Sequence, residues 1–298
     1  MQTEIVYNKK ISKIRLDFYL ASIYKKYSRS YFQKHIKKKE ILINGKSVLK
    51  SYNLKYKDII TITFNFFQKT QKYDIKPEKI KLNIIYEDDD VIILDKQAGI
   101  VTHPSYSHTS ETLLNALVMY FNGKYCPYLV HRLDKNTSGI IIFAKNIKAK
   151  INISKQLKDR TIKKVYLTAV KGIIQEDKGE IKAPIGRSPK NRKIMSVNSL
   201  AKKMAITEFE VLARKNGYTL LRVMIITGRT HQIRSHMKYI KHPIIGDQQY
   251  GGPVIIDNNY YKRQVLHAYK ITFLHPRTSN IMNFISEPHD DIKKIFNI

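Results

Sequence analysis

One short polar loop, residues 131–138, carries the residue types that could act on a bound ligand. It reads His-Arg-Leu-Asp-Lys-Asn-Thr-Ser, and the five apolar residues 140–144 that follow Gly139 predict a buried strand. The Thr and Ser that end the loop can hydrogen-bond their own backbone and so hold the loop tightly. Asp134 is therefore well placed, at the edge of a strand, to act on a ligand. Taken alone, the same residues could also form a simple Asp–Asn turn between two elements.

The composition of the 298-residue chain indicates a globular protein that binds a polyanion. Its apolar fraction is 43%, and no run of 18 apolar residues could span a membrane. Lys and Arg number 54 against 24 Asp and Glu, a formal net charge of +30. Codon drift in an AT-rich genome would raise Lys but also Asp and Glu, so it does not explain the imbalance. The charge is spread along the chain without a basic amphipathic helix or lipidation motif, which favours nucleic acid over a membrane surface.

The sequence offers no motif for a metal, a nucleotide cofactor or a disulfide. Cys126 is the single cysteine, and together with an N-terminus unlike a signal peptide it predicts a cytoplasmic protein. No phosphate-binding glycine loop occurs. His231 and His236 are five residues apart, which is the wrong helical spacing for two metal ligands. The acidic run 87–90 predicts a solvated turn rather than a metal site, so we expect neither metal nor cofactor.

A small basic α+β domain is predicted for residues 10–67, followed by a polar linker over residues 68–81. Ser28 is a candidate N-cap for the second of two helices, and Asn44-Gly45 is a dipeptide typical of hairpin turns. A flexible linker would let this domain hold RNA while it keeps the second domain close to the same molecule. The predicted elements are helices over 15–24 and from 29 onward, and strands over 41–43 and 59–64.

This order of elements resembles the alpha-L type RNA-binding domain of a ribosomal small-subunit protein and of tyrosyl-tRNA synthetases. The matching residues are Arg15-Leu16-Asp17, Ser28-Arg29-Ser30, Ile36, and Val48 after Leu42-Ile43-Asn44-Gly45-Lys46. The resemblance implies that Arg29, Lys34 and Lys46 bind RNA. The chain reads Lys38-Lys39-Glu40 where that family usually has a glycine, so we expect a longer or more strained turn there.

The second domain is predicted over residues 82–298. Val165 and Leu167 should lie on one face of a strand and Tyr166 on the other. Thr227 or Thr230 is expected to cap a helix whose apolar side includes Ile233 and Met237. The predicted strands cover residues 82–86, 91–94, 140–144, 164–170, 220–226 and 269–273, and the predicted helices cover 111–121, 146–160 and the segment after 230.

Two of its motifs resemble those of the RluA/RluD-type pseudouridine synthases. The first is His131-Arg132-Leu133-Asp134 with Thr137-Ser138-Gly139, and the second is Gly228-Arg229-Thr230-His231-Gln232-Ile233-Arg234. The segments 242–247, 250–252 and 266–268 match as well. Lys96-Gln97-Ala98-Gly99 resembles the family's Lys-Pro-x-Gly loop, but Gln97 replaces the usual proline and so removes some rigidity.

The resemblance implies a reaction and a role for each matching residue. Asp134 corresponds to the catalytic aspartate, Arg234 to the arginine that pairs with it, and Tyr166 to the tyrosine that packs against the target base. Arg132 would fill the space that a flipped uridine leaves, and His131 and Arg229 would contact RNA. The isomerisation consumes no water and transfers no electrons, so it requires no cofactor. The implied fold is α+β, a mostly antiparallel bent sheet with flanking helices and the active cleft across its middle.

The sequence therefore predicts a pseudouridine synthase that acts on structured RNA, with large-subunit ribosomal RNA as the expected partner and a monomer as the expected state. The motifs supply one carboxylate, whereas an ordinary glycoside hydrolase would need two. The alternative is an RNA-binding ribosome-assembly factor without turnover, which would be expected to carry damaged motifs. Asp134, Tyr166 and Arg234 are all present.

Overall fold

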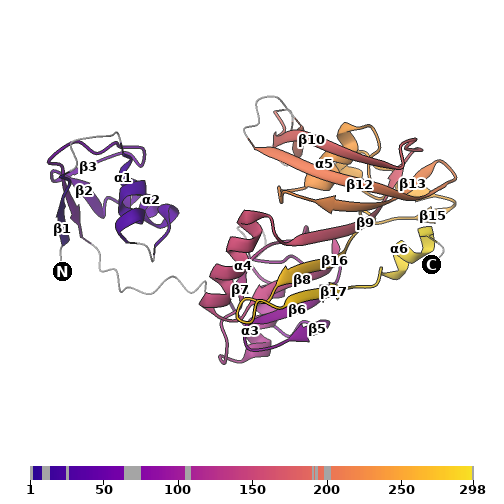
Figure 1. Cartoon of the computed structure of the whole chain (residues 1–298), viewed down its shortest axis with the longest axis horizontal. Helices are drawn as coiled ribbons and strands as arrows, with labels where there is room; N and C mark the ends of the chain where they lie inside the picture. Colours follow the sequence, from indigo (N-terminus) through magenta and orange to yellow (C-terminus); the bar gives the residue numbers. More distant parts are fainter. Residues whose placement is uncertain are drawn as a thin grey trace. The chain divides into compact units, whose positions relative to one another are not determined.

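The computed structural model divides the chain into two compact units, Met1–Tyr73 and Asp74–Ile298 (Figure 1). The second unit begins before residue 82, because part of the predicted linker packs on it. Asn115 Nδ2 donates to the carbonyl of Lys76, and the Glu78 carboxylate accepts the backbone N–H of Glu111. The rest of the linker, residues 68–74, lies outside the described residues, which are 3–8, 14–24, 27–63, 75–104, 109–189, 191, 194–197 and 203–296.

The first unit is a four-stranded antiparallel sheet, in the order β1-β4-β2-β3, with two helices. Its first strand precedes residue 10, so the unit is longer at its N-terminal end than the sequence predicted. Phe32 and Ile36 of the second helix and Leu16 and Leu20 of the first are buried in one core. The elements are β1 (Thr3–Val6), α1 (Leu16–Ile23), α2 (Arg29–Lys37), β2 (Ile41–Ile43), β3 (Lys46–Ser47) and β4 (Ile59–Ile62).

The local signals of this unit act as the sequence predicted. The Ser28 side chain accepts the backbone N–H of Tyr31 and so caps α2. Asn44 and Gly45 have φ of 50° and 74°, which gives the backbone twist that a tight hairpin between β2 and β3 requires. Lys39 has φ of 60° in the turn where the related domain usually has glycine. The expected strain is therefore present, because a side chain is disfavoured in this conformation.

The second unit is built on one large sheet with the strand order β11-β10-β12-β13-β9-β16-β8-β6-β5. Every pair of neighbours is antiparallel except β16 with β8, and the register shifts within β12 and β16, as happens where strands bend. This confirms the predicted α+β class. In addition, β7 pairs with β8 and β17 with β16, whereas β14 and β15 pair only with each other in a separate two-stranded sheet. The strands of the unit are β5 (Ile84–Glu87), β6 (Val91–Lys96), β7 (Tyr128–Leu129), β8 (Ser138–Ala144), β9 (Lys163–Lys171), β10 (Lys178–Arg187), β11 (Met195–Val197), β12 (Met204–Lys215), β13 (Tyr218–Ile225), β14 (Ile255–Ile256), β15 (Asn259–Tyr260), β16 (Leu266–Leu274) and β17 (Ile281–Ile285).

Helices cover both faces of the sheet at its β6–β8 end. Ile141 and Phe143 of β8 join one core with α3, whereas Ile140 and Ile142 join another with α4, so an uninterrupted apolar strand is buried on both sides. Figure 1 shows α4 beside β7 and β8, and α5 beside β10 and β12. The helices are α3 (Leu113–Phe121), α4 (Ile147–Asp159), α5 (Gln232–Tyr239), η1 (Gln248–Tyr250) and α6 (Asp290–Phe296).

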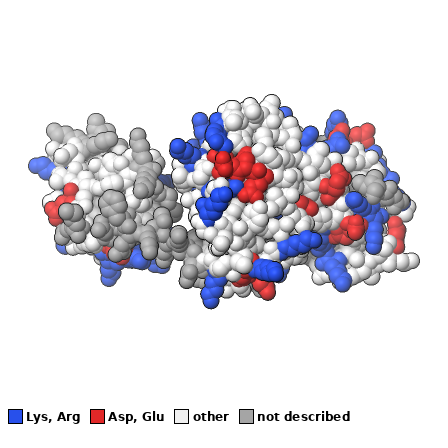
Figure 2. All heavy atoms as spheres, turned by 90° about the horizontal axis from the view of Figure 1, so that it is seen from below, with Lys and Arg blue, Asp and Glu red and all other residues white. Residues whose placement is uncertain are grey.

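The surface of the second unit is mixed in charge. On the face drawn in Figure 2, Lys and Arg are spread over the unit, while Asp and Glu gather in one larger group and a few smaller ones. Among the residues that the structure describes, no helix is long and apolar enough to cross a membrane.

Candidate active site

Hydrogen bonds to the backbone carbonyls of the loop that carries Asp134 fix that loop in place. Thr102 Oγ1 donates to the carbonyl of residue 133 at 3.0 Å, and Lys96 Nζ and the Gly99 N–H both donate to that of residue 135 at 2.9 Å. Arg263 Nη1 donates to the carbonyl of residue 136 at 3.0 Å. Burial lowers the pKa of Lys96 to about 7, and the nearby Arg263 adds to this effect. The loop is thus held rigidly before any substrate arrives.

Gly139 lets this loop approach the centre of the sheet. Its φ is +103°, and a Cβ at this position would lie 2.3 Å from the carbonyl oxygen of Ala268. No side chain fits there, so β8 and β16 can run side by side in parallel immediately after the loop. Ala268 is in turn paired with Tyr166 on β9. The close approach therefore brings Asp134 and Tyr166, which are 32 positions apart in the sequence, to one site.

Arg234 contacts the Asp134 carboxylate. Its Nη1 lies 3.1 Å from Asp134 Oδ2, and the two side chains are 7% and 19% exposed. His231 Nε2 is 3.8 Å from the same oxygen, and burial lowers the pKa of this histidine. The guanidinium of Arg234 thus places a positive charge directly against the Asp134 carboxylate.

A second carboxylate, Asp247, orients Arg234. It accepts Arg234 Nε at 2.7 Å and Nη2 at 2.8 Å, a bidentate geometry that fixes the guanidinium plane. Gln249 Oε1 accepts a further bond at 2.8 Å, and the guanidinium carbon lies 4.6 Å from the centre of the Tyr250 ring. The resemblance drawn from the sequence includes the segments of Asp247 and Tyr250 but implied no role for either residue. No local sequence pattern marks a residue that contacts an arginine from a distant part of the chain.

The entry into α5 differs from the prediction. His231, not Thr227 or Thr230, occupies the N-cap, with φ of 51° and no hydrogen bond from its side chain to the helix backbone. Thr227 Oγ1 instead donates to Gln232 Oε1 at 2.8 Å. Gln232 Oε1 also accepts the Arg229 N–H, so a glutamine rather than a threonine organises this turn. The predicted apolar side is correct, since Ile233 and Met237 are buried.

Tyr166 and His131 line the pocket in uncharged forms. Burial and the neighbouring Asp134 raise the pKa of Tyr166, so its ring stays neutral. Burial lowers the pKa of His131 to about 3. His131 Nε2 accepts the N–H of Ile142 at 3.1 Å, which ties the start of the loop to β8. Its direct contact with RNA stays a prediction.

The pocket has a volume of about 520 Å³, within the usual range for small-ligand sites. It lies at β9, the middle of the strand order, where the cleft was expected. Arg132 and Arg229 are at its lining, so all six residues predicted for this site, 131, 132, 134, 166, 229 and 234, come together. Lys158, Arg160 and Lys164 also line it and were not predicted.

The predicted RNA contacts of the first unit lie on its surface. Lys34 and Lys46 are exposed. Arg29 is about half exposed, and it donates to the buried Asp17 at 3.1 Å and lies over the Phe18 ring. Arg29 therefore also stabilises the unit itself, and the RNA contacts of all three residues stay predictions.

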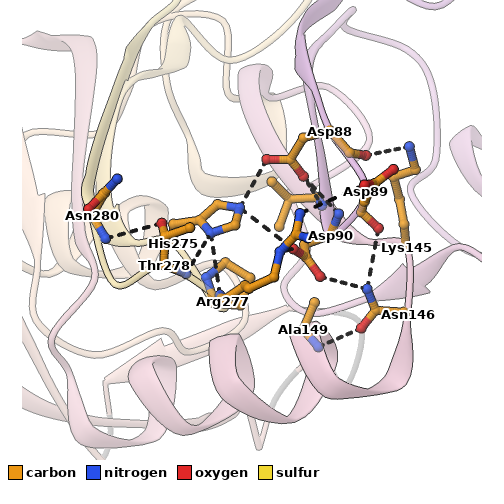
Figure 3. Close-up of polar contacts among 12 residues, drawn as sticks. Asp88, Asp89, Asp90, Lys145, Asn146, Ala149, His275, Arg277, Thr278 and Asn280 are labelled. Atoms are coloured by element: carbon orange, nitrogen blue, oxygen red, sulfur yellow. Dashed lines mark hydrogen bonds and ion pairs between the residues drawn. The ribbon is translucent and has the colours of Figure 1, made fainter.

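The acidic run 87–90 is not a simple solvated turn. The Asp88 carboxylate accepts the backbone N–H groups of Asp90 and Val91 and lies 2.9 Å from His275 Nε2, while Arg277 Nε lies 2.7 Å from Asp90 Oδ2 (Figure 3). Asp90 is buried, and of the three aspartates Asp89 has the most exposed side chain. Oxygen and nitrogen atoms of Asp88, Asp90 and His275 lie within 4.8 Å of one another. The chain itself nevertheless supplies the cationic and N–H partners that a metal ion would replace.

Comparison with known proteins defines the class. A family model described as RNA pseudouridylate synthase matches residues 90–239, and a model of the S4 domain matches residues 14–60. The chain therefore belongs to the RNA pseudouridylate synthase family. Both matches confirm the resemblances drawn from the sequence, since the S4 domain corresponds to the alpha-L type module.

Two relatives match this chain over almost its full length. It is 37% identical to the "Uncharacterized RNA pseudouridine synthase YlyB" of Bacillus subtilis, over 99% of this chain and 97% of the relative. It is 39% identical to "Ribosomal large subunit pseudouridine synthase D" of Buchnera aphidicola subsp. Baizongia pistaciae, over 95% and 92%. Among solved structures, "Human RNA Pseudouridylate Synthase Domain Containing 1" matches with a TM-score of 0.57 and 26% identity, over 70% of this chain and 83% of that one.

Proposed function

We propose that this pseudouridine synthase modifies uridines in large-subunit ribosomal RNA, with Asp134 as its one catalytic carboxylate and without a cofactor. The observation that carries the catalytic assignment is the contact of Asp134 with Arg234 in the pocket that Tyr166 lines. The substrate class is supported by the relatives named as large-subunit enzymes and by the S4 domain. We further propose that the protein acts as a cytoplasmic monomer.

The reaction breaks the bond between C1′ and N1, turns the uracil, and joins C1′ to C5. The proton leaves C5 and N1 gains one, so atoms balance without a second substrate. A single ionised carboxylate suffices, either as a nucleophile toward C1′ or as a base toward the C2′ proton. Arg234 holds the Asp134 carboxylate in place for either role, and Tyr166 offers the detached ring a flat apolar surface on which to rest.

The target base must leave its stack before Asp134 can reach the ribose, as in other enzymes that act on a base inside nucleic acid. Arg132 is exposed at the edge of the pocket. We propose that it occupies the space that the flipped uridine vacates. The basic residues of both units bind phosphates and thereby set affinity rather than the choice of base.

The substrate class is tested by incubating the protein with unmodified large-subunit, small-subunit and transfer RNA in parallel. Pseudouridines are mapped as carbodiimide adducts that stop reverse transcription. We expect new stops in large-subunit RNA alone. Stops only in transfer RNA would overturn the substrate assignment, and tight binding without stops in any RNA would favour an assembly factor that does not use its catalytic residues.

A further inference from the structure

Lys164 is a cation in the active-site pocket that the proposed reaction does not use. It lies on β9 two residues before Tyr166, so both side chains point to the same face of the strand, and both line the pocket. A Cβ at Gly228 would lie 3.4 Å from Lys164 Nζ, so the ammonium group sits close to the backbone of the turn between β13 and α5.

Lys164 is half-buried at the wall of the pocket and differs from the two buried lysines of this unit. Lys96 donates to three backbone carbonyls, and Lys145 pairs with Glu87 and donates to the carbonyl of Asp88 (Figure 3). Among the residues that the structure describes, none accepts a hydrogen bond from Lys164 or forms an ion pair with it. Burial lowers its pKa accordingly.

The ammonium group of Lys164 thus faces the pocket without an acceptor among the described residues. An unpaired and partly desolvated cation in a pocket is typical of a group that binds a ligand there. A role in packing would be served better by an uncharged side chain of similar length, such as Met. The cation therefore indicates that the missing acceptor belongs to the substrate.

The charge of the pocket identifies the kind of acceptor. Among the described residues that line it, Asp134 is the one carboxylate, and Arg234 already compensates its charge. Five further cations line the same pocket, so a bound group there meets an excess of positive charge. They are Arg132, Lys158, Arg160, Lys164 and Arg229. An RNA phosphate matches that excess better than a neutral carbonyl of uracil does.

The position of Lys164 on β9 indicates that it contacts the RNA backbone rather than the target base. The backbones of residues i and i+2 of a strand are about 6.6 Å apart, so Lys164 projects from a position next to Tyr166, on whose ring the base would rest. Lys158 and Arg160 are at the C-terminal end of α4, four residues or more before Lys164 in the chain, and line the same pocket. Cations are common at helix C-termini for electrostatic reasons alone, but this does not explain Lys164, which is on a strand.

We propose that Lys164, together with Lys158 and Arg160 of the same pocket, forms a phosphate-binding subsite for the RNA backbone next to the uridine that enters the pocket. The proposal rests on the proposed function, since it names how that substrate is held. Lys164 binds the phosphate equally in the ground state and in the transition state, so it contributes to KM rather than to kcat.

The test compares Lys164→Gln with Lys163→Gln, which removes the same charge from the neighbouring exposed residue. Binding of a large-subunit ribosomal RNA hairpin is measured by fluorescence anisotropy across a salt series. We expect Lys164→Gln to weaken binding roughly tenfold, as for the loss of one hydrogen bond between charged groups. The slope of log Kd against log salt should fall by about 0.7 to 1, the value for one phosphate contact. Lys163→Gln should change neither.

Two further measurements separate a phosphate contact from a structural role. Thermal unfolding should show Lys164→Gln to be as stable as the unmodified protein or more stable, because no partner is lost. Hairpins with a single neutral methylphosphonate next to the target uridine should include one that weakens binding by the unmodified protein. With that hairpin, Lys164→Gln should cause no further loss.

The proposal is overturned if Lys164→Gln binds with unchanged affinity and slope, if Lys163→Gln reproduces the loss, or if kcat falls while binding is unchanged. Turnover is scored separately with the unmodified protein on the same hairpin. Binding that depends on Lys164 without any pseudouridine would contradict the proposed function and leave the phosphate subsite standing.

Discussion

Asp247 offers a sharp test of how the site is held together, since it contacts Arg234 but does not line the pocket. Replacing it with Asn keeps the shape and one oxygen acceptor, but it presents an amide N–H₂ to a guanidinium N–H. One charge-assisted hydrogen bond is lost, which is worth about 1.5–3 kcal/mol. If Arg234 is needed in position during the chemical step, kcat should fall roughly 10- to 100-fold with KM for RNA little changed.

The assay follows tritium released from C5-labelled uridine in RNA, because C5 loses its hydrogen when it bonds to C1′. Asp257→Asn is the matched control, since Asp257 is exposed and bonds Asn216. Circular dichroism establishes that each variant is folded. An unchanged kcat in folded Asp247→Asn would refute the view that Asp247 positions Arg234, and a loss confined to KM would place its effect on binding instead.

Two further predictions concern stability. Burial is the main reason that the pKa of His267 is lowered to about 4 in the folded protein, whereas an unfolded histidine has a pKa of about 6.5. The stability contributed by the neutral His267 is therefore complete above about pH 6.5 and is lost as the pH falls toward 4. The free energy of unfolding should fall by about 2 kcal/mol between about pH 7.5 and 5. Urea unfolding across this range should show a shallower pH dependence for His267→Asn, and an identical dependence would contradict the assignment. Lys39→Gly should stabilise the first unit by about 0.5 kcal/mol, because relief of the left-handed conformation exceeds the entropy cost of glycine. Hydrogen exchange of α2 and β2 amides should slow accordingly, and faster exchange would show that Lys39 is unstrained.

The sequence predicted the elements whose signals are local. The run 140–144 became a strand buried on both faces, Ser28 became a helix cap, and Asn44-Gly45 became a hairpin turn. The two diagnostic motifs were also recoverable, because each is a contiguous stretch with a fixed place in the family. Asp134 and Arg234 are 100 residues apart, so their contact followed from the resemblance and not from any spacing in this chain.

What the sequence could not supply depends on long-range contacts. Asp247 belongs to a segment that matches the family, but only the structure places it against Arg234 and so gives it a role. The run 87–90 looked like a solvated turn because His275 and Arg277, which bind it, come nearly two hundred residues later. Thr227 and Thr230 are better N-caps by type than His231, but tertiary contacts of Gln232 determined where α5 begins. No local pattern distinguishes Lys164 from the other lysines of this basic chain, so its place in the pocket could not be predicted.

The central claim is that Asp134 is the one carboxylate that acts in the reaction, with Arg234 and Tyr166 positioned around it, while the basic residues bind RNA. The most direct measurement compares Asp134→Asn with the unmodified protein, scoring pseudouridine formation and RNA affinity in the same preparation. We predict no detectable pseudouridine from the variant and an RNA Kd within about threefold of the unmodified protein, because phosphate contacts dominate affinity. Turnover by pure Asp134→Asn would contradict the account.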